Sequence, residues 1–200
     1  MNITLYVEGG RDGKALQVRC RQGFRKFVEK AGLEGRMPRI KACGGRERAY
    51  KDFKTALEAG DGIAMLLVDA ERPVGGASPW IHLRNRDGWD RPNGAGDEHC
   101  HLMVQVMESW FLADRPALVW FYGQGFQENA LPGTSSIEHI SKADVLNGLA
   151  RATRNSSKGS YDKGSHSFEI LGRIDPSVVE SVAPFAKHLL DVLRAGGPQP

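Results

Sequence analysis

The chain begins with a short apolar run that predicts a buried β-strand. Residues 3–7 (ITLYV) are apolar or β-prone and lead into Glu8, after which two glycines predict a turn. A longer run at residues 63–68 (IAMLLV) contains no polar residue and leads into Asp69. Unbroken apolar runs are typical of central parallel strands that are covered on both faces. The longer run is therefore the strongest strand prediction in the chain.

Helical periodicity separates these two runs. Apolar residues recur at helical spacing over residues 16–31, with basic residues on the outer positions, and a second helical pattern covers about residues 46–59. Between them, residues 38–43 (PRIKAC) predict a further strand. The order strand, helix, strand, helix, strand predicts a doubly wound α/β domain. In such domains the functional crevice lies beyond the carboxyl ends of the strands.

The rest of the chain predicts one more strand and a mainly helical region. Residues 72–98 read as an irregular connection, and residues 101–107 as a fourth strand that is followed by Glu108 and a short helix. The Gly/Ser-rich residues 154–166 predict a loop. The last helix is expected to begin at Asp175-Pro176 and to end near Arg194, and the other helices are predicted over residues 114–122 and 141–153.

Charge is distributed unevenly along the chain. Residues 1–60 hold 14 Lys and Arg against 7 Asp and Glu, whereas residues 61–200 hold 13 against 17. A basic half is the minimum footprint expected of a protein that binds a polyanion, although basic helix faces are also commonly just solvated. The candidate nucleic-acid-binding residues lie at the first helix and in the later loop: Lys14, Arg21, Arg25 and Lys158.

Aromatic residues and cysteines give weaker evidence about function than the charge distribution does. Trp110 and Trp120 lie in apolar company, which predicts burial, and only Trp89 is favoured for a nucleic-acid face. The three cysteines are widely spaced and odd in number, which favours reduced thiols and a cytoplasmic protein. No stretch approaches the roughly 18–20 apolar residues of a membrane span, and the N-terminus lacks the pattern of a secretory signal, so we expect no membrane contact.

Acidic residues follow the two strongest strands. Glu8 follows the first, and Asp69 and Glu71 follow the third, two residues apart and hence on one face of an extended segment. Clustered carboxylates favour a hard divalent cation such as Mg²⁺ or Mn²⁺, although each residue alone could instead cap a helix or pair with an arginine. Glu108 is a fourth candidate ligand or a helix N-terminal acid. Lys163 is a phosphate-binding candidate or a solvated loop residue.

Several segments resemble known families. LYVEGG, the helix after it and the long strand ending in Asp-x-acidic resemble the Toprim fold of topoisomerases, bacterial primases, recombination-repair proteins and overcoming-lysogenization-defect nucleases. This resemblance implies that Glu8 acts in general acid/base chemistry and that Asp69 and Glu71 hold Mg²⁺. Glu71 replaces the usual Asp, and its extra methylene moves the oxygen that a second metal would use. With QVRCRQGFRKFVEKAG, HLMVQVMESWFLAD and YDKGSHSFEIL, these segments also resemble domain-of-unknown-function family 4276 over nearly the whole chain.

The resemblance completes the prediction of the fold. A length of 200 residues suits a single α/β domain with little room for a second, and the resemblance implies that residues 1–200 hold a Toprim-like (Rossmann-like), mostly parallel sheet flanked by helices. Residues 1–115 would form the core sheet with the metal site, and residues 116–200 a helical extension with the basic loop. A topoisomerase or primase is not expected, because 200 residues leave no space for the accompanying domains.

These observations predict a Mg²⁺-dependent phosphodiesterase that acts as a DNA or RNA nuclease. Asp69 and Glu71 would hold the metal, Glu8 would exchange a proton or share a second metal with Glu108, and Lys163 would neutralise the substrate backbone. Related Toprim proteins often work beside an ABC-type ATPase in phage defence, so the resemblance implies such a partner. The alternatives are a non-catalytic module that binds nucleic acid or a nucleotide for a partner ATPase, and a structural subunit that interacts through its C-terminal helix.

Overall fold

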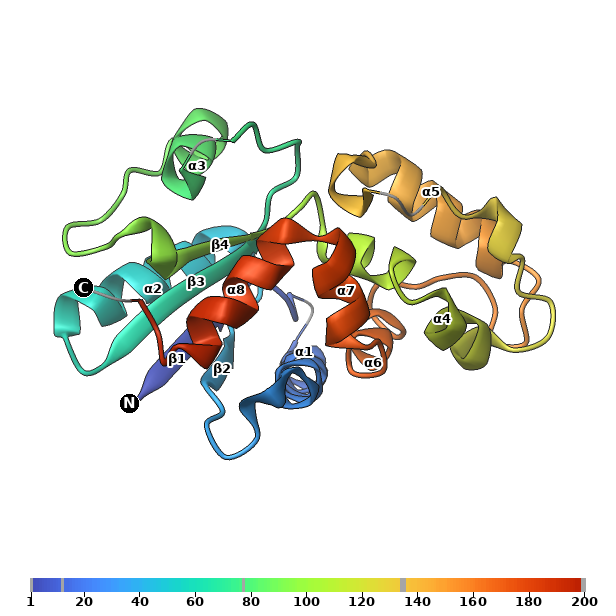
Figure 1. Ribbon diagram of the computed structural model, residues 1–200, viewed down its shortest axis with the longest axis horizontal. Helices are drawn as coiled ribbons and strands as arrows, with labels where there is room; N and C mark the ends of the chain where they lie inside the picture. Colours follow the sequence, from blue (N-terminus) through green and yellow to red (C-terminus); the bar gives the residue numbers. More distant parts are fainter. Residues whose placement is uncertain (1, 12, 77, 134–135, 199–200) are drawn as a thin grey trace.

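A parallel β-sheet forms the centre of the computed structural model, which describes residues 2–11, 13–76, 78–133 and 136–198 (Figure 1). Within these residues the sheet has four strands in the order β2-β1-β3-β4, and every neighbouring pair is parallel. This confirms the predicted α/β, Rossmann-like class, with a sheet that is parallel throughout. The strands are β1 (Ile3–Val7), β2 (Arg39–Ala42), β3 (Ile63–Asp69) and β4 (Cys100–Met103).

Both faces of the sheet are buried, which explains the apolar run of β3. Successive strand residues point to opposite faces. Met65 and Leu67 enter one apolar cluster, whereas Leu66 and Val68 enter a second cluster on the other face. Both faces of β3 are therefore buried. A polar side chain on either face would lower the free energy of unfolding unless it found a hydrogen-bond partner.

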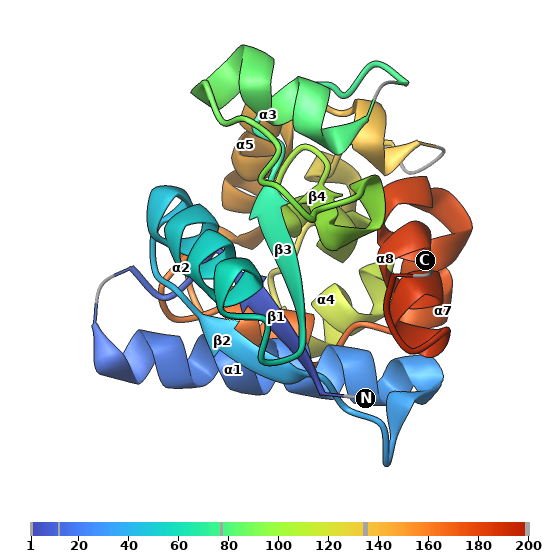
Figure 2. The same cartoon turned by 90° about the vertical axis from the view of Figure 1, so that its left-hand side faces the viewer.

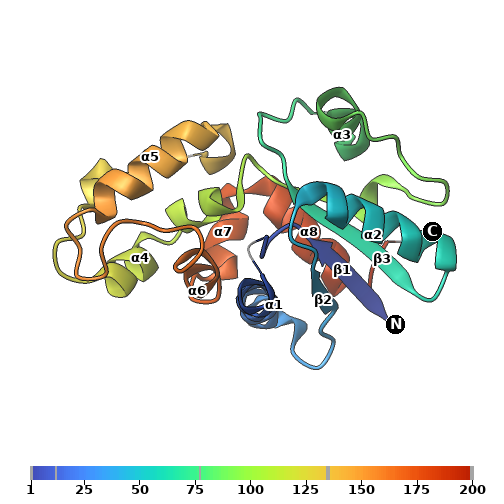
Figure 3. The same cartoon turned by 180° about the vertical axis from the view of Figure 1, so that it is seen from behind.

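Helices cover the two faces of the sheet. Figure 2 shows the sheet between α2 and α8, and in Figure 3 α2 lies in front of the strands. α1 and α8 pack against the first face, and α2 and α3 pack against the second. These four helices are α1 (Lys14–Val28, continued by the π-helical segment Glu29–Leu33), α2 (Arg46–Ala59), α3 (Pro79–Asp87) and α8 (Pro184–Arg194).

One segment that was predicted to be irregular contains a helix. Within residues 72–98, α3 begins after Ser78, whose hydroxyl accepts a hydrogen bond from the Trp80 amide at 3.3 Å. Pro79 occupies the first turn, and Gly88 ends the helix with a φ of 73°. The prediction was wrong because Ser, Pro and Gly, which are common in loops, here stand at the start and the end of a helix.

The last predicted helix is in fact two helices. α7 (Pro176–Val182) ends at Ala183, and α8 begins at Pro184. Proline has no backbone N–H to continue a helical ladder, and it disfavours helical geometry in the residue before it. The apolar stripe continues across this break, so periodicity alone could not reveal it.

The fourth strand is shorter than predicted. β4 ends at Met103, and Glu108 lies in a 3₁₀ segment, η3 (Met107–Leu112). The helices predicted over residues 114–122 and 141–153 are confirmed as α4 and α5. The remaining elements are η2 (Asp97–His99), α4 (Arg115–Tyr122), η4 (Glu128–Ala130), η5 (Ile137–His139), α5 (Lys142–Thr153) and α6 (Ser167–Leu171).

The helices after residue 115 share a core with the sheet. One cluster of buried side chains runs from Leu5 in β1 through Trp110 in η3 to Leu149 in α5 and Leu190 in α8. None of the helices that the structure describes is both long enough and apolar enough to cross a membrane.

Candidate metal centre

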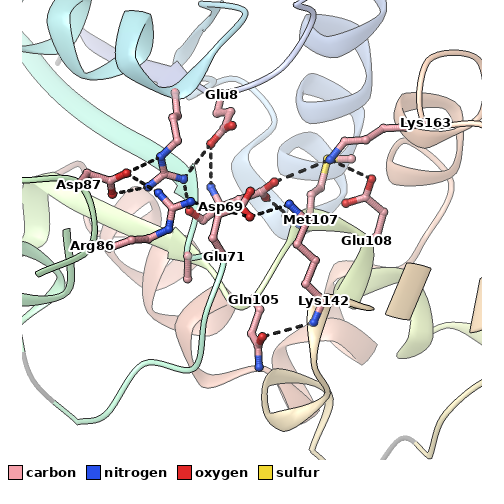
Figure 4. A network of polar contacts seen from close by, with 12 residues as sticks. Glu8, Asp69, Glu71, Arg86, Asp87, Gln105, Met107, Glu108, Lys142 and Lys163 are labelled. Atoms are coloured by element: carbon pink, nitrogen blue, oxygen red, sulfur yellow. Dashed lines mark hydrogen bonds and ion pairs between the residues drawn. The ribbon is translucent and has the colours of Figure 1, made fainter. Parts of the chain in front are cut away.

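Three carboxylates meet at the carboxyl edge of the sheet (Figure 4). Glu8 follows β1 directly, Asp69 ends β3, and Glu71 lies two residues further on. Val7 pairs with Leu67 in the parallel register, so Glu8 and the end of β3 are neighbours. One oxygen from each carboxylate lies within 4.8 Å of the other two. The structure thus brings together the three residues that the sequence predicted.

Glu8 is held by a backbone amide and an arginine. Its Oε2 atom accepts a hydrogen bond from the Asp69 amide at 3.2 Å and lies 3.4 Å from Nη1 of Arg46. Burial raises the pKa of Glu8, and the positive charge of Arg46 opposes part of this rise. The pKa of Glu8 therefore lies above that of an exposed glutamate.

Asp69 is the most buried of the three carboxylates, with 4% of its surface exposed. Its Oδ1 atom accepts a hydrogen bond from the Met107 amide at 2.8 Å, and its Oδ2 atom lies 3.8 Å from Nζ of Lys163. Burial, together with the nearby charges of Glu108 and Glu8, raises the pKa of Asp69 to about 8. The positive charge of Lys163 therefore offsets only part of the effect of burial and of the neighbouring acids on the pKa of Asp69.

Glu71 joins the group through an uncommon backbone conformation. Its φ of 66° is left-handed, and its amide donates a hydrogen bond to the Gln105 carbonyl at 2.7 Å. Its Oε2 atom accepts a hydrogen bond from Nζ of Lys142 at 2.6 Å and lies 3.9 Å from Nη2 of Arg86. The predicted reason for its position was wrong, because β3 ends at Asp69 and Glu71 is not part of an extended segment.

Glu108 reaches the trio through Lys163. Glu108 is completely buried, its Oε1 atom accepts a hydrogen bond from the Tyr161 hydroxyl at 2.8 Å, and the same atom lies 3.3 Å from Nζ of Lys163. Its Oε2 atom has no hydrogen-bond partner among the described residues. Burial lowers the pKa of Lys163, but Glu108 and Asp69 more than offset this effect, so that the pKa is raised. Lys163 therefore stays charged between Glu108 and Asp69.

Arg46 connects several residues of the site by hydrogen bonds, although it was not identified as a site residue from the sequence. Its Nε and Nη2 atoms donate to both oxygens of Asp87, at 3.1 and 2.7 Å, and its Nη1 atom donates to the Asp69 carbonyl at 2.6 Å. Arg46 begins α2 directly after the glycine pair that follows β2, and this position at the carboxyl edge was a signal that could have identified it. Lys142 and Tyr161 were also missed, and no local sequence signal marks them.

The three carboxylates, together with Arg46 and Lys163, line a cleft of about 410 Å³. Two glycine pairs form part of its wall, and the backbones of Gly9 and Gly44 exchange hydrogen bonds of 2.8 and 2.9 Å. A Cβ atom on Gly10, whose φ is 81°, would lie 2.7 Å from the Cα atom of Gln17. Glycine is thus required at this turn, which forms the wall of the cleft next to Glu8.

The trio fits a divalent cation in donor chemistry and in charge. Opposite oxygens around an octahedral Mg²⁺ lie about 4.2 Å apart, so a spread of up to 4.8 Å requires only small side-chain shifts. The surrounding network also carries one more carboxylate than it has cations. Its acidic members are Glu8, Asp69, Glu71, Asp87 and Glu108, and its basic members are Arg46, Arg86, Lys142 and Lys163.

The other basic candidates lie outside the lining of this cleft. Lys14 is exposed at the start of α1, and Arg21 and Arg25 line a different groove beside the segment that leads into β2. Nζ of Lys158 lies 4.6 Å from the centre of the Phe121 ring. Nucleic-acid binding by these four basic residues stays a prediction.

The tryptophans follow the expectation only in part. Trp110 is fully buried as predicted, but Trp120 is 70% exposed. α4 buries Leu118 and Phe121, and Trp120 lies between these positions on the outer side of the helix. The prediction for Trp120 was wrong because a short helix with apolar residues on several sides can bury only one of them. Trp89 stacks on Tyr50, with ring centres 4.5 Å apart.

Comparison with known proteins identifies one family. The sequence model of the family described as Domain of unknown function (DUF4276) matches residues 7–194. No match was found among curated proteins or among solved structures. The family match spans every residue of the candidate metal centre.

Proposed function

The chain belongs to the DUF4276 family, a family of unknown function, and we propose that it is a metal-dependent phosphodiesterase that cleaves DNA or RNA. The observation that carries this proposal is the grouping of Glu8, Asp69 and Glu71 within 4.8 Å, in an open cleft that Lys163 also lines. Ligands of open α/β sheets bind at this carboxyl edge. The resemblance of the first and third strands to Toprim nucleases supports the same reaction.

The residues of the site divide the chemistry among them. Asp69 and Glu71 would hold Mg²⁺ or Mn²⁺, which when bound would polarise a phosphoryl oxygen and lower the pKa of a coordinated water. Glu8 would exchange the proton of the attacking or leaving oxygen, since burial raises its pKa above that of an exposed glutamate, which is the direction that favours general acid/base work. Lys163 would offset the negative charge of the phosphate.

Cleavage assays on plasmid DNA and labelled RNA test this proposal. We expect the wild type to cleave in Mg²⁺ or Mn²⁺ and to stop in EDTA. Glu8→Gln should slow cleavage by about a hundredfold or more, because a general acid/base group is removed. Asp69→Asn should abolish cleavage, whereas Asp61→Asn, at an exposed position before β3, should leave it unchanged. Equal cleavage by all the variants would refute the site, and a wild type inactive in every metal would refute the activity.

A non-catalytic binding module is the second candidate. Arg46 and Lys142 already pair with Glu8 and Glu71, which favours a site that is partly neutralised without metal. Such a module would bind nucleic acid or a nucleotide and would leave turnover to a partner, for which the Toprim resemblance implies an ABC-type ATPase in phage defence. Calorimetric titration with Mn²⁺ separates the candidates. Binding that requires Asp69, without cleavage alone or with the ATPase, would favour the module.

A further inference from the structure

A second cleft adjoins the metal centre. It has a volume of about 650 Å³ and lies between α1 and the region of α6. Phe168 lines both clefts, and Gly164, in the wall of the first, is followed by Ser165 in the wall of the second. Figures 1 and 3 show α6 between α1 and α4. A chain bound at the metal centre can therefore continue past the loop that carries Lys163 into the second cleft.

The second cleft is basic. Arg19 and Lys26 line it about two helical turns apart on one side of α1, and neither side chain has an ion-pair or hydrogen-bond partner among the described residues. Arg173 lines the opposite side, and its Nη2 atom donates to Glu169 at 2.8 Å. The lining thus has three cations and one carboxylate, an excess of positive charge that suits a polyanion.

An exposed aromatic side chain lies beside the Arg173 end of this cleft. Trp120 is 70% exposed, and the Arg173 guanidinium lies 4.3 Å from the centre of its ring. Nζ of Lys158 lies 4.6 Å from the centre of the adjacent Phe121 ring. Large aromatic side chains are usually well buried. An exposed ring beside a cation can stack on an unpaired base while nearby positive charges meet phosphates.

We propose that Arg19, Lys26, Arg173 and Trp120 form a tract that binds a single-stranded segment of the nucleic acid cleaved at the metal centre. This inference rests on the proposed function and names its substrate class. Bases in a duplex are stacked on one another, so their faces are closed to Trp120, whereas a single strand can splay out a base for stacking.

Fluorescence anisotropy of a labelled single-stranded oligodeoxythymidine, measured in EDTA to prevent cleavage, tests the tract. Trp120→Ala should weaken binding by about fivefold or more. Arg19→Gln and Lys26→Gln should each reduce the slope of log affinity against log salt by about 0.7. Val119→Ala removes a neighbouring apolar side chain that is 42% exposed, and Lys51→Gln removes an exposed charge on α2. Both control variants should bind as the wild type does.

Glu169→Gln gives a prediction of the opposite sign. It removes the carboxylate of the lining and releases Arg173, so it should tighten binding and steepen the salt dependence, which a folding defect would not do. The inference is overturned if the wild type binds no oligonucleotide, if Trp120→Ala and Glu169→Gln bind as the wild type does, or if a duplex of the same length binds as tightly. A wild type that binds as predicted but cleaves nothing in any metal supports the tract and refutes the nuclease instead.

Discussion

Replacing Asp69 with Asn should change how the stability of the metal-free protein depends on pH. The pKa of Asp69 is raised from the ordinary value of 3.8 to about 8 in the folded protein, first by burial and then by Glu108 and Glu8. Between these pH values the unfolded chain carries a charged Asp69, whereas the folded protein carries a protonated one. Each pH unit in this window therefore favours unfolding by about 1.4 kcal/mol.

The effect is large compared with the stability of an ordinary domain. Between about pH 5 and about pH 8, Asp69 should cost the metal-free wild type about 4 kcal/mol, against a typical total of about 5–15 kcal/mol. Below the pKa of Asp69 in the unfolded chain, Asp69 is protonated in both the folded and the unfolded protein. Above its pKa in the folded protein, it is charged in both. In neither range does Asp69 make the free energy of unfolding depend on pH. Asn cannot ionise, yet its side-chain oxygen can still accept the hydrogen bond from the Met107 amide. The free energy of unfolding of Asp69→Asn should therefore change less with pH than that of the wild type, and at pH 8 the variant should be more stable than the wild type.

Urea unfolding in EDTA at a series of pH values measures this difference. The fully buried Trp110 provides a fluorescence signal for unfolding. Asp61→Asn, which removes an exposed carboxylate, should keep the slope of the wild type. Saturating Mn²⁺ should flatten the wild-type curve, because a bound cation stabilises the charged carboxylate. If wild type and Asp69→Asn lose equal stability between pH 5 and pH 8, the reasoning from burial is refuted.

Two further substitutions test the packing and the charge network, both by urea unfolding. A Cβ atom on Gly23 would lie 2.5 Å from the Phe168 carbonyl oxygen, so Gly23→Ala should lower the free energy of unfolding by about 1–3 kcal/mol. Gly133→Ala, where no atom of the described residues lies within 4 Å of the added carbon, should change this free energy by less than about 0.5 kcal/mol, and equal effects of the two substitutions would contradict the close approach. Arg46→Met should cost about 3 kcal/mol, because it leaves Glu8 without its ion-pair partner in a largely buried site and leaves Asp87 with Arg86 alone. An Arg46→Met variant as stable as the wild type would refute that role.

The sheet could be predicted from the sequence because burial on both faces leaves a simple pattern. The run at residues 63–68 is apolar throughout, and the glycines after residues 8 and 43 mark the ends of two other strands. The errors fell where a local signal has two meanings. Ser78 and Gly88 are as common in loops as at helix ends, and Pro184 interrupts a stripe whose apolar spacing continues past it.

The candidate site could be predicted only as far as strand ends define it. Glu8 and Asp69 follow from the carboxyl edge of a parallel sheet. Glu71 depends on a left-handed backbone that is rare for glutamate, and the Lys142 side chain reaches it from 71 positions away. No periodicity in the chain encodes either feature, because both depend on tertiary packing.

The basic face of α1 is a further case in which tertiary packing limits what the sequence can predict. Arg19, Arg21, Arg25 and Lys26 all occupy outer positions of the helix, so the sequence could not say which of them would line a cleft. Arg19 and Lys26 line the cleft beside α6 because Gly23, on the same side of α1, lets the two helices approach closely. Arg21 and Arg25 line another groove.

Anomalous scattering from a crystal soaked in Mn²⁺ tests the central claim most directly, since it locates the ion and its ligands together. We predict a manganese peak between the three carboxylates, in contact with oxygens of Asp69 and Glu71 and beside Glu8, and no peak there in a crystal of Asp69→Asn. A saturating soak that leaves this position without manganese, or that places the ion elsewhere, would contradict the metal centre and the function proposed from it.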